Sequence, residues 1–147
     1  MERPLTGELP LPMWPEGVAL GKADPVAVHA LLRVCYAQGF GEVPASAKEW
    51  WEIVSNDSEF DPELALSAIE PSGRPAGFIL CWTAGFIKDV GVRPDLRWRG
   101  IGASLISEGM RRLASRGLKT VALKVRDDNA VARQLYERMG FEAKLAW

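Results

Sequence analysis

A glycine-containing turn with basic side chains is the stretch of this sequence best suited to chemistry. An apolar strand is predicted over residues 86–92, and Gly100 and Gly102 open an amphipathic helix shortly after it. The N–H groups and positive dipole end of a helix's first turn attract anions, glycines let a phosphate approach the backbone, and Arg97 and Arg99 add charge. The turn therefore predicts a phosphate site, although two glycines alone also fit an ordinary strand-to-helix turn. It is neither a Walker loop nor a complete Gly-x-Gly-x-x-Gly fingerprint.

The charge distribution supports a polyanionic ligand at this turn. The 147-residue chain has a net charge of −1, but residues 88–126 carry a balance of +7 and residues 1–87 a balance of −7. The basic block surrounds the glycine turn, as a phosphate-bearing ligand would favour. Nucleic acid would also be attracted, but the sequence shows no aromatic–basic alternation or nucleic-acid motif, so no nucleic-acid partner is predicted.

A second stretch, residues 129–141, strengthens the interpretation of the first. It begins at Asn129, includes Tyr136, and ends in Gly140-Phe141. Taken alone it is typical of a plain amphipathic helix closed by a glycine. Taken with Arg-x-x-Gly-x-Gly after a Val-x-Val strand, and in this order, it resembles the GCN5-related N-acetyltransferase (GNAT) family.

The resemblance implies an α/β fold, a mixed sheet with helices on both sides. In this fold the strands 86–92 and 119–125 run parallel and splay apart, and acetyl-CoA enters between them. The main chain of the first of these strands pairs with the pantetheine arm like an added strand, and the turn after it holds the pyrophosphate. The cofactor-binding residues implied are Val90, Gly91, Val92, Arg97, Trp98, Arg99, Gly100, Ile101, Gly102, Ala103 and Asn129.

The chemistry implied is attack of a neutral amine on the acetyl-CoA thioester, with no metal. A main-chain N–H near Val92 would stabilise the oxyanion. Tyr136 matches the tyrosine that relatives use as general acid, and a phenol with a pKa near 10 holds a transferable proton at neutral pH. Tyr136 is therefore the predicted catalytic residue, with a merely packed core aromatic as the alternative.

The general base stays unassigned. The positions where relatives place a carboxylate or histidine are Phe86, Lys88 and Lys124 in this chain. Asp89 is close, but on an alternating strand it points away from Lys88 and Val90. A water-relayed carboxylate, or an amine that arrives already deprotonated, are the other possibilities.

The predicted function is transfer of an acetyl group to a primary amine of a small molecule or peptide, by direct attack in a ternary complex. The alternative is a non-catalytic acyl-CoA-binding sensor. Residues 40–61 hold six acidic side chains against Lys48, with Trp50 and Trp51 between them, where relatives bind acceptors. These features predict a cationic acceptor, whereas a solvated acidic face and packed tryptophans are the alternative.

The predicted site residues must be positioned by a series of strands and helices, which the sequence pattern also predicts. Residues 1–16 hold four prolines and predict an extended N-terminal arm, and residues 17–147 form a single GNAT domain. The order is β-α-α-β-β-β-α-β-α-β. The ranges are strands 18–20, 64–69, 76–82, 86–92, 119–125 and 141–145, and helices 25–37, 46–54, 100–115 and 129–139.

The end of the chain departs from the family pattern. Relatives run past the strand that begins at Phe141 into a hairpin whose final strand fills the gap beside the splayed strand, and here little follows Leu145. Either the sequence is truncated, or a partner or the N-terminal arm completes the sheet. An open edge favours association, and we therefore predict a homodimer that uses the C-terminal strands.

Composition excludes several other classes. The 48% hydrophobic and 25% charged fractions are those of a globular protein. No apolar run approaches the roughly 18 residues of a membrane span, and the N-terminus lacks a signal-peptide pattern, which predicts a cytoplasmic protein without a membrane partner. Two cysteines without a Cys-x-x-Cys pair and a single histidine, His29, argue against zinc or a histidine-based triad.

Overall fold

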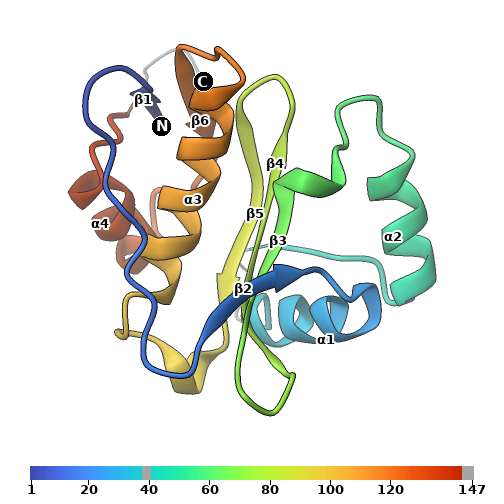
Figure 1. Ribbon diagram of the computed structural model, residues 1–147. Coiled ribbons are helices and arrows are strands. Elements are labelled where there is room, and N and C mark those ends of the chain that lie inside the picture. Colours follow the sequence, from blue (N-terminus) through green and yellow to red (C-terminus); the bar gives the residue numbers. More distant parts are fainter. Residues whose placement is uncertain (38–40, 144–147) are drawn as a thin grey trace.

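A six-stranded sheet with helices on both faces forms the centre of the molecule (Figure 1). The structure is a computed structural model that describes residues 1–37 and 41–143. The strand order is β1-β6-β5-β4-β3-β2, and every neighbouring pair is antiparallel except β5 and β6, which are parallel. The predicted mixed α/β sheet is therefore confirmed. The strands are β1 (Glu2–Pro4), β2 (Ala19–Lys22), β3 (Ala65–Ile69), β4 (Pro75–Trp82), β5 (Phe86–Val92) and β6 (Thr120–Leu123).

The first two helices each begin directly after a capping side chain. Asp24 accepts a hydrogen bond from the Val26 N–H at the start of α1 (Pro25–Cys35), and Ser46 accepts one from the Glu49 N–H at the start of α2 (Ala47–Ser55). Such caps satisfy N–H groups that the helix itself leaves unpaired. The other helices are α3 (Ile101–Ser115) and α4 (Ala130–Arg138), with single 3-10 turns at Pro62–Leu64 and Pro94–Leu96.

The described residues form two apolar cores, one on each face of the sheet, and each core is covered by a different pair of helices. One core lies between the sheet, α3 and α4 and includes Ile79, Leu105 and Phe141. The other lies between the sheet, α1 and α2 and includes Leu32 and Phe78. In Figure 1, α3 and α4 accordingly lie on the left of the sheet and α1 and α2 on the right. Both faces of the central strands are covered, so the ends and edges of strands are where a ligand can reach the backbone.

The N-terminal arm contributes a strand that the sequence pattern did not predict. Strand β1 pairs with β6 through Glu2↔Ala122 and Pro4↔Thr120. Glu2 also exchanges main-chain hydrogen bonds of 2.9 Å with Glu142. Met1 and Leu5 beside the strand are buried in the core, and this burial fixes the arm against the sheet.

This arrangement corrects the expectation of a missing last strand. Of the predicted strand 141–145, residues 141–143 show an isolated bridge at Glu142, and residues 144 and 145 lie outside the described residues. The far edge of β6 is occupied by β1. The N-terminal arm therefore occupies this edge of β6, and the homodimer that uses the C-terminal strands stays a prediction.

Candidate functional site

Two parallel strands that separate create the main cleft of the molecule. Strands β5 and β6 pair only at Phe86↔Ala122 and Ile87↔Leu123. Beyond these pairs β5 continues to Val92, and none of the described residues pairs with it on its β6 side. A cleft of about 820 Å³ opens there, between β5, the end of β6, the turn before α3, one side of α4 and the end of α1. Its volume lies within the range of small-molecule sites.

A β-bulge in β5 shapes this cleft. Leu80 pairs with Asp89 but Cys81 pairs with Ile87, which leaves Lys88 as an extra residue. A bulge bends its strand and increases the local twist, and β5 leaves β6 at this point. The bulge also breaks the alternation of side chains, because Ile87 and Val90 both pack into the α3–α4 core.

The bulge corrects the predicted orientation of Asp89. The Asp89 and Val90 side chains point to opposite sides of the strand, as alternation predicts. The Asp89 side chain lies on the same side as that of Lys88, and Lys88 Nζ is 3.8 Å from Asp89 Oδ2. Asp89 therefore lines the cleft on the side of α1 and is only 7% exposed.

The turn at the mouth of the cleft has the features of an anion site. Gly100 is the N-terminal cap of α3 with φ of 82°, and no side chain of residues 1–37 or 41–143 caps the first turn of this helix. No acidic residue lies in that turn, and Gly102, Ala103 and Arg97 line the cleft. The uncapped N–H groups and the helix dipole therefore face the cavity.

Trp98 is an unusual residue in the same turn. It has a φ of 68°, in the left-handed region that non-glycine residues seldom adopt, and its side chain is 76% exposed. The residue lines the cleft, so a strained backbone presents a large exposed ring at its mouth.

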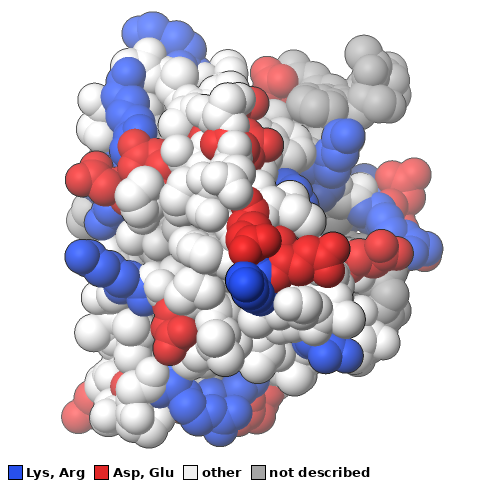
Figure 2. Space-filling view, turned by 90° about the vertical axis from the view of Figure 1, so that its right-hand side faces the viewer, with Lys and Arg blue, Asp and Glu red and all other residues white. Residues whose placement is uncertain are grey.

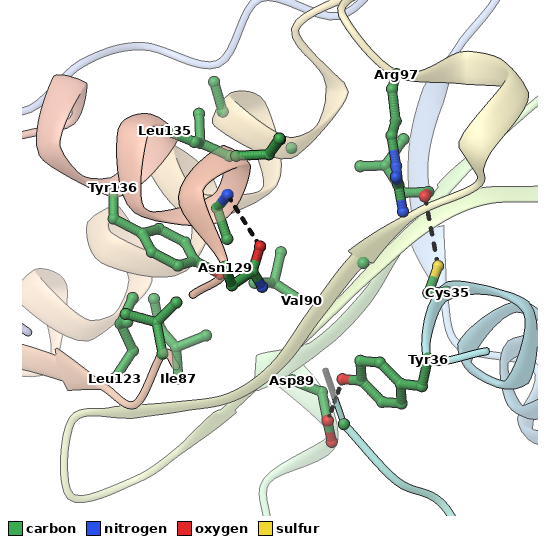
Figure 3. Close-up of a pocket in the computed structure, with 18 of the residues that line it drawn as sticks. Cys35, Tyr36, Ile87, Asp89, Val90, Arg97, Leu123, Asn129, Leu135 and Tyr136 are labelled. Carbon is green, nitrogen blue, oxygen red and sulfur yellow. Dashed lines mark hydrogen bonds between the residues drawn. The ribbon is translucent and has the colours of Figure 1, made fainter. Parts of the chain in front are cut away.

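The α4 wall carries the two residues of the second sequence motif (Figure 3). Asn129 Oδ1 accepts a 3.3 Å hydrogen bond from the Ala132 N–H and so caps α4. The Tyr136 ring packs against Phe141 with centroids 5.9 Å apart and is 8% exposed. Burial raises the pKa of Tyr136 to about 12, with a smaller contribution from the Asp89 carboxylate, so the hydroxyl keeps its proton at neutral pH.

The opposite wall contains residues that sequence reasoning missed. The Tyr36 hydroxyl donates a 2.6 Å hydrogen bond to Asp89 Oδ1. The Cys35 thiol donates to the Val92 carbonyl at 3.4 Å, and burial raises the pKa of this thiol. Both residues end α1, and no spacing in the sequence connects them with β5, 53 and 57 residues away. Only tertiary packing could identify them.

Most of the predicted site residues meet at the cleft. Two of them, Ile101 and Arg99, do not line it. The Ile101 side chain is buried in the core, where it faces the sheet beside Gly77. Arg99 is exposed but is not part of the cleft lining. Their main chain still belongs to the turn. The predicted residues that line the cleft are Val90, Gly91, Val92, Arg97, Trp98, Gly100, Gly102, Ala103, Asn129 and Tyr136.

The segment 40–61 is arranged differently from its predicted acceptor role. Phe40 lies outside the described residues, and of the acidic side chains only Glu42 lines the cleft. Asp61 pairs with Arg116 at 2.8 Å, and the face that carries α2 shows acidic side chains interspersed with basic ones (Figure 2). The charge of this segment is therefore directed mainly away from the cleft.

The two tryptophans of α2 are packing residues. Trp50 is 3% exposed and contacts His29 and Phe78, while Trp51 lies edge-on to Phe60. Neither ring lines the cleft. The stacking role considered for them is not supported, and their aromatic area instead fixes α2 to the sheet.

Within residues 1–37 and 41–143, no group of three or more His, Cys, Asp or Glu side chains is arranged to hold a metal ion. None of the helices in these ranges is long and apolar enough to cross a membrane.

Comparisons with known proteins agree with this geometry. Residues 26–141 match the Acetyltransferase (GNAT) family. Mycothiol acetyltransferases from Thermobispora bispora and Streptomyces coelicolor are 32% and 34% identical to this chain, each over 96% of it. The chain spans about half the length of these curated relatives, 52% and 48% respectively.

Solved structures show the same fold. A GCN5-related N-acetyltransferase from Sphaerobacter thermophilus superposes with a TM-score of 0.80 at 30% identity, covering 97% of this chain and 47% of that one. The ribosomal-protein-S18-alanine N-acetyltransferase from Escherichia coli gives a TM-score of 0.65 over 86% of this chain and 79% of its own. At 23% identity, the second likeness concerns the fold alone.

Proposed function

Because the chain belongs to the acetyltransferase (GNAT) family, we propose that it transfers an acetyl group from acetyl-CoA to a primary amine. The observation that carries this proposal is the cleft between β5 and β6, which combines an unpaired strand edge with the uncapped N-terminus of α3. An extended thioester arm ending in phosphates needs both features. The strand edge offers main-chain hydrogen bonds to an amide-containing arm, and the helix end attracts the phosphates.

In this proposal the donor lies along β5 with its reactive end beside the bulge. The main chain of residues 90–92 pairs with the pantetheine amides, and Asn129 reaches the arm from the opposite wall. The pyrophosphate binds at the N–H groups of Gly102 and Ala103, with Arg97 as a counter-charge. The thioester then lies between Tyr136 on α4 and Asp89 on β5, both of which line the cleft.

The reaction proposed is direct attack of the amine nitrogen on the thioester carbonyl. A main-chain N–H on the free edge of β5 near Val92 stabilises the oxyanion. The carbon–sulfur bond breaks as the adduct collapses, and the Tyr136 hydroxyl supplies a proton to the departing CoA thiolate. Since the pKa of Tyr136 is about 12, the hydroxyl is protonated throughout the physiological pH range.

A pair of substitutions at Gly102 tests donor binding. A Cβ at this position would lie 3.5 Å from both Leu135 and Val92, which is ordinary contact, so Gly102→Ala fits the fold. Gly102→Asp adds a negative charge at the same place, and an acidic residue near a helix N-terminus does not destabilise the helix. At an effective dielectric constant of about 20, one charge about 5 Å from one phosphate charge costs about 3 kcal/mol.

Isothermal titration calorimetry with acetyl-CoA measures the difference. We expect Gly102→Asp to weaken binding by about 100-fold or more and Gly102→Ala by far less. Equal affinities for the wild type and Gly102→Asp would place the donor elsewhere. Thiol release from acetyl-CoA across a panel of amines then distinguishes an acetyltransferase from a non-catalytic sensor, which would bind acetyl-CoA without turnover.

A further inference from the structure

Asp89 is a buried carboxylate in the cleft that the mechanism above leaves without a role. It lies on β5 directly after the bulge residue Lys88, and the bulge turns it toward α1 instead of the α3–α4 core. Its side chain is 7% exposed and lines the same cleft as Tyr136 on the opposite wall. Burying a carboxylate is costly unless hydrogen bonds and an opposite charge compensate for it, so the partners of Asp89 indicate what this position can do.

The two oxygens of Asp89 have unequal surroundings. Oδ1 accepts a 2.6 Å hydrogen bond from the Tyr36 hydroxyl, as Figure 3 shows. Among the residues that the structure describes, the ion-pair partner of Oδ2 is the Lys88 ammonium at 3.8 Å, and that lysine side chain is 46% exposed. A contact of this length to a half-exposed lysine is weak and easily replaced. One oxygen is therefore held in place, while the other is available to a stronger cationic donor.

Tyr36 itself is rigidly placed. It is the C-terminal cap of α1, and its N–H donates a 2.9 Å hydrogen bond to the Leu32 carbonyl. Gly41 lies directly over its ring, since a Cβ on Gly41 would approach ring carbons within 2.8 Å. The ring is thus confined between α1 and the start of the segment that leads to α2, and its hydroxyl fixes the direction of the Asp89 carboxyl group.

Resting on the proposed function, we propose that Asp89 and Tyr36 form the binding site for the acceptor amine. The acceptor's alkylammonium group binds Asp89 Oδ2, displaces Lys88 and gives up one proton to that oxygen. Asp89 is then a catalytic residue and Tyr36 a positioning residue. The acceptor class is a primary alkylamine that is charged at neutral pH, in preference to weakly basic aromatic amines.

The proton and electron balance of the step is complete. One N–H proton moves to Asp89 Oδ2, and the freed lone pair forms the N–C bond at the thioester carbonyl. The C–S bond then breaks, the thiolate takes the Tyr136 proton, and the phenolate regains a proton from the new amide nitrogen. Asp89 returns its proton to solvent, so ammonium and acetyl-CoA give amide, CoA thiol and one proton.

The local electrostatics fit a proton acceptor. Burial raises the pKa of Asp89, while the Lys88 ammonium and the Tyr36 hydrogen bond act in the opposite direction. A carboxyl with a raised pKa accepts a proton more readily than an exposed one does. The charged and titratable groups that line the cleft together with Asp89 come from β5, the end of α1, the segment after α1, the turn before α3, the segment between β6 and α4, and α4. They are Lys88, Cys35, Tyr36, Glu42, Arg97, Lys124, Arg126, Tyr136 and Arg138.

Asp89→Asn and Tyr36→Phe test the proposal. The matched control is Asp61→Asn, because Asp61 pairs with Arg116 and does not line the cleft. The amine that the wild type acetylates fastest is compared with aniline, whose nitrogen is neutral at pH 7. We expect Asp89→Asn to lower kcat/KM for the alkylamine by about 100-fold or more and for aniline by much less, with unchanged acetyl-CoA affinity. Asp61→Asn should match the wild type.

Tyr36→Phe supplies a second readout that does not depend on full loss of activity. Removing the hydrogen bond that lowers the pKa of Asp89 raises that pKa, so the acidic limb of the kcat/KM–pH profile should move to higher pH. Activity should recover at alkaline pH. A purely structural role for Tyr36 would lower the profile without moving it.

The outcomes separate this proposal from the proposed function. Asp89→Asn with wild-type kcat/KM and an unmoved pH profile would overturn the amine site while leaving acetyl transfer intact. A wild-type protein that binds acetyl-CoA but acetylates no amine would overturn both. Equal losses for the alkylamine and aniline would also reject Asp89 as the proton acceptor.

Discussion

Substitution of Tyr136 by phenylalanine tests the general acid with the smallest structural change. The phenyl ring keeps its contact with Phe141, whose ring centroid is 5.9 Å away, so only the hydroxyl is removed. Loss of a general acid costs about 10²–10⁴ in rate. A 100-fold loss corresponds to about 2.7 kcal/mol in the activation free energy. Because the phosphate turn is untouched, acetyl-CoA affinity should be unchanged.

The pH dependence adds a second test of Tyr136. Burial raises the pKa of Tyr136 to about 12, so the hydroxyl does not ionise between about pH 6 and 9 and produces no alkaline limb there. Single-turnover thiol release, measured across this range, reports chemistry without product release. We expect Tyr136→Phe to be slower by a constant factor at every pH.

A small effect would refute the reasoning. If single-turnover rates of Tyr136→Phe stay within about fivefold of wild type, Tyr136 supplies no proton to the thiolate. Its burial against Phe141 would then be its whole role. A changed acetyl-CoA affinity would instead indicate that the hydroxyl binds the donor.

Three further predictions concern stability and association. Gly77→Ala should lower the free energy of unfolding by about 1–3 kcal/mol in urea titrations. The new Cβ would lie 2.9 Å from the Leu105 side chain and 3.0 Å from the Gly91 carbonyl oxygen. An unchanged free energy of unfolding would show that these neighbours move aside. Asp89→Asn should raise Tm at neutral pH, because the pKa of Asp89 is raised in the folded protein and its ionised carboxylate is therefore destabilising. This increase in Tm should disappear as pH falls toward 4. An increase that does not depend on pH would contradict this reasoning. Removing residues 1–5 should destabilise the fold and promote self-association in sedimentation velocity, since it uncovers β6; a stable monomer would show that β1 is dispensable.

Local signals predicted most of the elements. Asp24 before Pro25, and Ser46 three residues before Glu49, are capping patterns that act within one helical turn. The structure places α1 and α2 within two residues of the predicted ranges. Apolar periodicity likewise located β3 to β5, because it depends only on neighbouring side chains and the face they cover.

The glycine turn and the Tyr136 motif were also readable from the chain. The turn depends on local features, namely a strand, a glycine at positive φ and a helix without an acidic first turn. The structure brings Gly102 and Tyr136 to one cleft. Their element order identified the family before any contact was known. Their roles in binding and catalysis stay predictions.

Tertiary pairing decided what the sequence pattern could not. The bulge at Lys88 arises from the register between β4 and β5. Alternation within β5 alone predicts that Asp89 and Lys88 point to opposite sides, and the bulge places them on the same side. The bond from Tyr36 to Asp89 joins residues 53 positions apart. Strand β1 is three residues long, too short for periodicity to detect, and it exists only because β6 offers an edge more than 110 residues away. Such contacts depend on which surfaces meet after folding. The chain's local chemistry therefore predicts the elements, while only their packing brings Tyr36 and Asp89 together in the cleft.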